Sequence, residues 1–142
     1  MSLDKDSISV EFALSIAKKY YSSETYLHAM RVADYVVENT MIPSKYKDNC
    51  VILAIMHDLI EDTEYDGAGL PENLYRALKL LSKPKCMDYI EYIKNIKNTQ
   101  HISWREWAYW VKLADMKDHL SQRETLVDRL KEKYLNALAY LL

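Results

Sequence analysis

Hydrophobic residues recur every three or four positions along most of this chain, and polar residues fill the positions between them. In the first such segment Ile8, Phe12, Ile16 and Tyr20 are four residues apart, so a helix would carry them on one side. The same spacing continues in later segments up to the end of the chain. We therefore predict helices and place no strand. The pattern predicts about seven helices, near residues 7–20, 25–39, 44–62, 71–81 and 87–97, one from 103, and one from about 121 to 141.

Several sequence signals support these boundaries. Ser103-Trp104-Arg105-Glu106 has the form of a capping box that opens a helix, and Ser121-Gln122-Arg123-Glu124 repeats that form. Pro43 suits the first turn of the third helix. Both glycines lie in the loop 64–69. With only 2 Gly and 3 Pro in the chain, long helices are favoured over a sheet of many strands. We predict an all-α fold.

Length and composition indicate one domain, residues 1–142, with a substantial core. The net charge is −2 and there is no basic stripe, so a nucleic acid polymer is not the expected partner. No stretch approaches the roughly 20 apolar residues of a membrane span, and the amino terminus has no apolar signal core. Cys50 and Cys86 lack the spacing of a metal site and are expected to be buried or half-buried reduced thiols. We therefore expect a cytoplasmic protein that does not bind membranes.

Candidate chemistry is concentrated in His57-Asp58-Leu59-Ile60-Glu61-Asp62-Thr63, which follows the apolar run 51–55. On one continuous helix, the imidazole and the three carboxylates would lie within one region of space. So many charges beside an apolar segment are unfavourable unless a cation or a tight hydrogen-bond network compensates them. Imidazole with carboxylates suits Mn, Fe, Zn or Co better than Ca.

Two further residues can complete a metal site. His28 lies within the amphipathic segment 25–39, and Asp115 ends the apolar run Val111-Lys112-Leu113-Ala114. We therefore predict that His28, His57, Asp58 and Asp115 bind one divalent cation. Mn²⁺ is our first choice, and Fe, Co, Ni and Zn are compatible with the same ligands.

The order His … His-Asp … Asp on three helices resembles the HD-domain metal-dependent phosphohydrolases. The resemblance is closest to the stringent-response alarmone ((p)ppGpp) hydrolases, where the motifs read His-Asp-x-x-Glu-Asp-Thr and Val-Lys-Leu-Ala-Asp. It covers about residues 12–120 and implies a compact HD-type helical domain. The chain differs from that branch in several places. The basic segment before His28 is shorter, and Tyr26 lies two residues before His28 where that branch has a tyrosine three residues before it. Ala29 stands where those enzymes have a proline, and His119 stands where they generally have a nucleotide-proximal asparagine.

The resemblance also implies roles for individual residues. Glu61 and Asp62 would be catalytic, orienting the attacking water and moving its proton. Lys112 would neutralise phosphate charge, and His119 would be a second substrate-binding residue. The partner would be a small phosphorylated molecule, with nucleotides as the expected class, and the aromatic-rich carboxy-terminal half could support a homodimer.

Three functions remain open on the sequence. The first is a metal-dependent phosphohydrolase that cleaves a nucleotide phosphoester, with guanosine 3′-diphosphate alarmones as one candidate substrate. The second is a nucleoside 5′-monophosphate phosphatase. The third is a non-catalytic HD-fold sensor of a nucleotide or metal, although pure binding would not require the Glu61–Asp62 pair.

Structural explanations compete with these roles. His28 could be hydrogen-bonded to Asp34, and Asp115 could pair with Lys112 or His119. Asp62 could simply end a helix, although a carboxylate there opposes the helix dipole. We expect the tryptophans at 104, 107 and 110 to be packing residues, the lysines at 94 and 97 to be solvated, and the histidine at 101 to be incidental.

Overall fold

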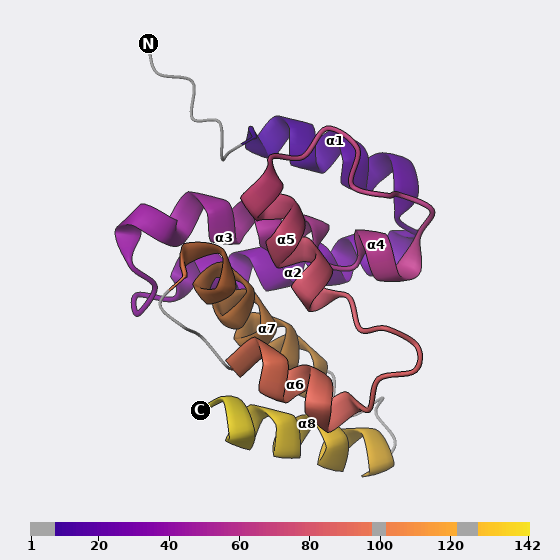
Figure 1. Ribbon diagram of the computed structural model, residues 1–142, viewed down its shortest axis with the longest axis vertical. Helices are drawn as coiled ribbons and strands as arrows, with labels where there is room; N and C mark the ends of the chain where they lie inside the picture. Colours follow the sequence, from indigo (N-terminus) through magenta and orange to yellow (C-terminus); the bar gives the residue numbers. More distant parts are fainter. Residues whose placement is uncertain (1–7, 98–101, 122–127) are drawn as a thin grey trace.

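The computed structural model describes residues 8–97, 102–121 and 128–142, and these form an all-helical domain without strands (Figure 1). This confirms the predicted fold class. The helices are α1 (Val10–Tyr20), α2 (Ser23–Glu38), α3 (Ser44–Met56), α4 (Leu59–Asp62), α5 (Glu72–Leu81), α6 (Tyr89–Lys97), α7 (Ser103–Ser121) and α8 (Asp128–Leu141).

Serine side chains begin the first two helices. Ser9 accepts a hydrogen bond from the backbone N–H of Phe12 at 3.0 Å, and Ser22 accepts one from Thr25 at 3.2 Å. A serine cap satisfies one of the N–H groups that lack a partner in the first turn. The cap at Ser9 explains why α1 starts at Val10, later than the sequence pattern predicted.

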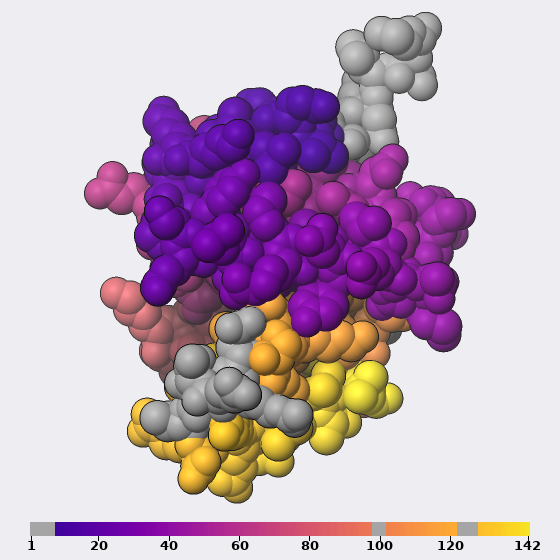
Figure 2. Space-filling model, turned by 180° about the vertical axis from the view of Figure 1, so that it is seen from behind, coloured from indigo at the N-terminus to yellow at the C-terminus, as the bar shows by residue number. Residues whose placement is uncertain are grey.

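The central helices are α2, α3 and α7, which pack against one another. Helix α1 covers α3, and α5 packs on both α3 and α7. The carboxy-terminal helices α6 and α8 pack on α7 and on each other. Seen from behind, the amino-terminal helices form one part of the surface and α7 with α8 forms another (Figure 2).

The second half of α3 is apolar on nearly all sides. This suits its position, because α1, α2, α5 and α7 all pack against it. Residues 52–56 are all buried there, and Leu53 is fully inaccessible. A helix that is hydrophobic all round belongs in the interior. Leu74, Leu78 and Leu81 are also buried and lie on one side of α5, consistent with the apolar spacing of the segment 71–81.

The predicted helix 44–62 is wrong as one element, because the helical hydrogen-bond pattern is interrupted at His57 and Asp58. In a continuing helix the Asp58 N–H would bond to the Ala54 carbonyl. Instead the His57 ring takes that carbonyl, with Nδ1 2.6 Å from the oxygen. The Tyr21 hydroxyl donates to the Ile55 carbonyl at 2.8 Å and accepts the Asp58 N–H at 3.2 Å. Two side chains therefore replace helical bonds and divide the predicted helix into α3 and α4.

Other expectations have mixed outcomes. Trp107 is buried, and the tryptophans at 104 and 110 are partly buried, which confirms their packing role. Cys50 is buried but Cys86 is exposed, so the prediction for Cys86 is wrong; it lies in the exposed turn between α5 and α6. The histidine at 101 and most of the capping sequence 121–124 lie outside the described residues. Within the described part of the chain, no helix combines the length and apolar character needed to cross a membrane.

Candidate metal centre

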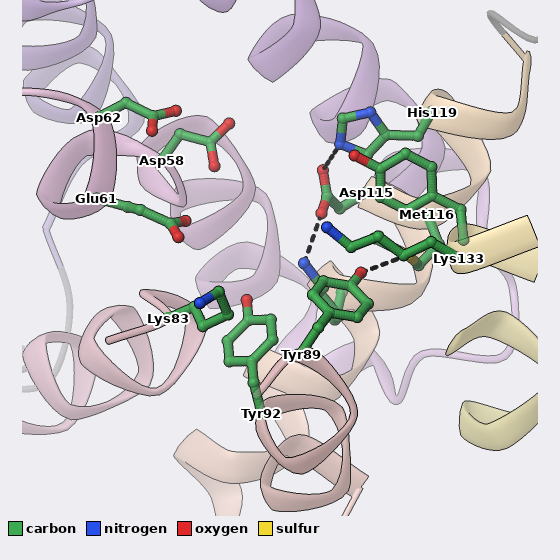
Figure 3. Close-up of a pocket in the computed structure, with 12 residues that line it drawn as sticks. Asp58, Glu61, Asp62, Lys83, Tyr89, Tyr92, Asp115, Met116, His119 and Lys133 are labelled. Atoms are coloured by element: carbon green, nitrogen blue, oxygen red, sulfur yellow. Dashed lines mark hydrogen bonds and ion pairs between the residues drawn. The ribbon is translucent and has the colours of Figure 1, made fainter. Parts of the chain in front are cut away.

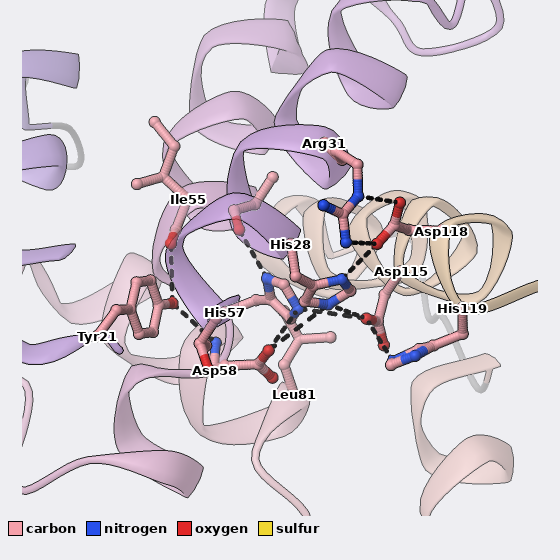
Figure 4. Close-up of polar contacts among 12 residues, drawn as sticks. Tyr21, His28, Arg31, Ile55, His57, Asp58, Leu81, Asp115, Asp118 and His119 are labelled. Atoms are coloured by element: carbon pink, nitrogen blue, oxygen red, sulfur yellow. Dashed lines mark hydrogen bonds and ion pairs between the residues drawn. The ribbon is translucent and has the colours of Figure 1, made fainter. Parts of the chain in front are cut away.

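The structure brings the four predicted ligands together from three separate parts of the chain (Figure 4). His28 comes from α2, His57 and Asp58 from the junction of α3 and α4, and Asp115 from α7. The His28 Nε2 atom lies 2.9 Å from Asp115 Oδ1 and 3.6 Å from Asp58 Oδ2. The His57 Nε2 atom lies 3.2 Å from Asp58 Oδ2 and 3.3 Å from Asp115 Oδ1.

The His57 ring is oriented by the backbone. A carbonyl oxygen can only accept, so Nδ1 must donate its proton to Ala54, and the lone pair of a neutral ring is then on Nε2. Nε2 is buried and has no hydrogen-bond partner among the described residues, although two carboxylate oxygens lie near it. A lone pair that faces two anions needs a proton or a metal cation between them.

The His28 ring is held between two carboxylates. Its Nδ1 lies 2.6 Å from Asp118 Oδ2, while its Nε2 faces Asp115. Asp118 is 1% exposed and also accepts from Arg31, at 2.8 Å from Nε and 3.1 Å from Nη2. A neutral imidazole has one N–H, so it cannot donate to both acids. With Nδ1–H donated to Asp118, Nε2 can act as a metal ligand, and an outer carboxylate of this kind commonly orients ligating histidines.

These atoms are close enough for a metal ion. Within the described residues, two groups of potential ligand atoms lie within 4.8 Å of one another: His28, His57 and Asp58, and His28, Asp115 and His119. Imidazole nitrogen and carboxylate oxygen suit Mn, Fe, Co, Ni or Zn. The unpartnered Nε2 of His57 and the clustered carboxylates fit a bound cation. The cluster can therefore hold a metal ion.

The charges at the centre are strongly coupled. Burial opposes ionisation of Asp115, but Lys112 and the neighbouring histidines outweigh burial and hold the pKa of this carboxyl well below its ordinary value. Burial likewise opposes protonation of His57, but Asp58 and Asp115 raise its pKa well above the usual range. The surroundings therefore favour an anion at Asp115 and a positive charge beside His57.

Asp115 makes both of the alternative pairings that the sequence left open. Lys112 Nζ lies 2.9 Å from Asp115 Oδ2, and His119 Nε2 lies 3.2 Å from Oδ1. Lys112 is buried, with 7% of its surface exposed, and its charge compensates Asp115 directly. For His28, the partners are Asp118 and Asp115, in place of the suggested Asp34.

A cavity of about 240 Å³ opens beside the cluster (Figure 3). Asp58, Glu61 and Asp62 lie on one side, and Asp115 and His119 lie opposite. The remaining wall is aromatic and cationic and comprises Lys83, Tyr89, Tyr92, Lys112, Met116, Lys133 and Tyr134. Eight site residues were predicted from the sequence, and six of them line this cavity. The other two, His28 and His57, do not line it.

Glu61 and Asp62 have altered acidity. Desolvation and the charges of Asp58 and Asp62 raise the pKa of Glu61. Desolvation and the charge of Asp58 raise the pKa of Asp62. Both side chains keep contact with solvent. Carboxyl groups with raised pKa values are better suited to accept and return protons near neutral pH.

Sequence reasoning missed several residues of this region. Asp118 lies three residues after Asp115, and Arg31 lies three residues after His28, so helical spacing could have indicated both. Lys83 and Lys133 had no local signal, because only the packing of α5, α6 and α8 brings them to the cavity. Lys97, considered from the sequence, instead donates to the Tyr140 carbonyl.

In the comparisons with known proteins, no family model and no curated protein matches this chain.

Proposed function

We propose that this protein is a metal-dependent phosphohydrolase of the HD type that acts on a small phosphorylated molecule, with nucleotides as the first class to test. The observation that supports this most directly is the shared cavity of the His/Asp cluster and the Glu61–Asp62 pair. A metal site alone would not need two additional carboxyl groups with raised pKa values beside it.

His28, His57, Asp58 and Asp115 would hold the cation. When bound, a divalent cation would lower the pKa of the water it contacts, to about 7 in the best cases. His57 and His28 keep their Nε2 atoms directed at the site through Ala54 and Asp118, and Lys112 keeps Asp115 ionised.

Glu61 and Asp62 would handle the proton of the reaction. As a water oxygen forms its bond to phosphorus, one of these carboxylates accepts the water proton. As the phosphorus–oxygen ester bond breaks, the proton returns to the departing alcohol oxygen. A positioned general base or acid typically contributes about 10²–10⁴-fold to the rate.

The cationic wall supports a phosphorylated substrate. No described carboxylate lies within salt-bridge distance of Lys83 or Lys133. Within the described part of the chain, Lys83 Nζ donates to the carbonyls of Pro84 and Met87, and Lys133 Nζ lies 4.1 Å from the Tyr89 ring centroid. Burial and the charges of Lys112 and Lys83 lower the pKa of Lys133. An anionic substrate would relieve this accumulation of positive charge, whereas Lys112 is already paired with Asp115.

A nucleotide panel tests the proposal and separates the alternatives. The purified chain is incubated with guanosine 3′-diphosphate compounds and nucleoside 5′-monophosphates, with Mn²⁺ or with a chelator. Pyrophosphate released from a 3′-diphosphate supports the alarmone substrate, and phosphate with nucleoside supports the phosphatase. Lack of release from every compound, with cation still bound, would favour the sensor and contradict the proposed hydrolysis.

Two substitutions separate the metal ligands from the proton-transfer residues. We expect Asp58→Ala to lose bound cation and turnover together, because it removes a ligand. We expect Glu61→Ala to retain the cation and lose about 10²–10⁴-fold in rate. Metal content and activity of each purified variant are measured side by side. Glu64→Ala is the matched control, since Glu64 is an exposed carboxylate three residues further on. Loss of cation in Glu61→Ala would refute its assigned role.

A further inference from the structure

His119 lies closer to the cluster than a residue that only contacts substrate would need to. It follows Asp115 by one turn of α7, and its Nε2 lies 3.2 Å from Asp115 Oδ1. The same oxygen lies 2.9 Å from His28 Nε2 and 3.3 Å from His57 Nε2. Three imidazole nitrogens therefore surround one carboxylate oxygen (Figure 4).

Stacking fixes the orientation of the His119 ring without using either of its nitrogens. Its ring stacks on Tyr134, with centroids 4.5 Å apart and planes 9° apart. It also lies 4.8 Å from the His28 ring, centroid to centroid. Unlike the Nδ1 atoms of His28 and His57, its Nδ1 makes no hydrogen bond to a described residue, so Nδ1 is free to carry the proton of a neutral ring. One third of the side chain is exposed, and His119 lines the cavity beside the cluster.

We infer that His119 is a third imidazole ligand of the cation, a role that rests on the proposed function. Asp115 and His119 are four residues apart on one helix, and this spacing places two ligands on the same face, as in the H-E-x-x-H metal motif. His28, Asp115 and His119 already form one of the two groups with ligand atoms within 4.8 Å of one another. The donor set would then comprise three imidazoles and two carboxylates.

A third imidazole changes the expected metal. Imidazole suits Zn, Cu, Fe and Ni, whereas carboxylate, carbonyl and water suit Mg and Mn. His119 therefore shifts the preference of this site from Mn²⁺, expected from the sequence, towards Fe, Co, Ni or Zn. Lys83 and Lys133, which line the same cavity, would then be the main contacts of the substrate phosphate.

The test compares the full chain with His119→Asn after loading with Zn²⁺, Co²⁺ or Mn²⁺. X-ray absorption of the Zn²⁺ form counts bound imidazoles, and we expect three in the native protein and two in the variant. Competition with a chelator measures affinity. We expect Co²⁺ and Zn²⁺ affinity to fall at least about tenfold, since even loss of an outer partner costs 10–100-fold, and Mn²⁺ affinity to fall less. Tyr134→Phe, which keeps a stacking ring, should still show three imidazoles, and circular dichroism verifies the fold of each variant.

Two results would overturn the inference without touching the proposed function. One is a count of two imidazoles in both native protein and His119→Asn, with equal affinities. The other is a higher KM in His119→Asn with unchanged metal binding, which would make His119 a substrate contact. Failure of the native chain to bind any of the three cations would instead remove the metal centre itself, and with it both proposals.

Discussion

At the level of single residues, the most informative side chain is Asp118, which sequence analysis did not select. It is buried and accepts hydrogen bonds from both Arg31 and the Nδ1 of His28. Burial alone would raise the pKa of this carboxyl, but Arg31 and His28 outweigh burial and lower it. Asp118 therefore remains an anion and directs His28 Nε2 at the cluster.

Asp118→Asn tests this positioning role. The amide replaces one accepting oxygen by an NH₂ group, which then faces a donor of Arg31 or His28. We expect cation affinity to fall about 10–100-fold, the usual effect of removing an outer partner of a metal ligand. Isothermal titration with Mn²⁺ or Co²⁺ measures the change, and Asp34→Asn, an exposed acid on α2, is the control. A folded Asp118→Asn protein with native affinity would show that His28 is oriented by other contacts.

The residue types in the cluster were predictable because they are unusual in their local setting. His57 and Asp58 follow an apolar run, and Asp115 ends another, where charges need compensation. Arg31 and Asp118, which orient His28, were not selected. Their helical spacing from His28 and Asp115 was visible, but the contact between them forms only when α2 meets α7. Lys83 and Lys133 were missed for the same reason.

At the level of the helices, the junction between α3 and α4 follows from two side chains that compete with the helix for its own backbone groups. The sequence pattern of residues 44–62 is helical throughout, so periodicity could not locate this break. One competitor, His57, is local; the other, Tyr21, comes from the end of α1. The break gives Asp58 a backbone conformation of φ −97° and ψ 0°, away from the ordinary helix.

Tyr21→Phe tests how the junction is stabilised. The substitution keeps the buried ring but leaves the Ile55 carbonyl and the Asp58 N–H without the hydroxyl. We expect the free energy of unfolding to fall by about 1–3 kcal/mol, the cost of leaving buried polar groups unsatisfied. Urea denaturation followed by circular dichroism gives this value. Tyr20→Phe is a close control, since the Tyr20 hydroxyl bonds to none of the described residues. Equal midpoints for the two variants would mean that water replaces the hydroxyl at no cost.

At the level of the whole molecule, the all-α class and most helix positions were predictable from hydrophobic spacing. The helices that pack on α3 and α7 do so through apolar residues spaced three or four apart, and that spacing is visible in the sequence. The convergence of α2, α3 and α7 depends on long-range contacts and became visible only in the fold. Cys50 marks this convergence: it is fully buried on α3, with its Sγ 4.0 Å from the Trp107 carbonyl of α7.

The two cysteines should therefore react very differently with a thiol reagent. Cys86 is exposed and should react at once in native buffer. Burial raises the pKa of Cys50 to about 12 and excludes reagent, so Cys50 should react only when α3 and α7 separate. Mn²⁺ should slow the second reaction further, because a ligand of the folded state alone lowers the unfolded population. Cys86→Ser isolates the slow thiol, and simultaneous reaction of both thiols in the native protein would contradict the packing of Cys50.

The position of the cluster along the chain also has a consequence for biosynthesis. His28, His57 and Asp58 leave the ribosome well before Asp115 and His119, which lie on α7. A nascent chain that ends before α7 offers only part of the donor set, because Asp115 and His119 are still missing. We therefore expect a product truncated before α7 to hold the proposed cation only weakly, because it would carry His28, His57 and Asp58 alone.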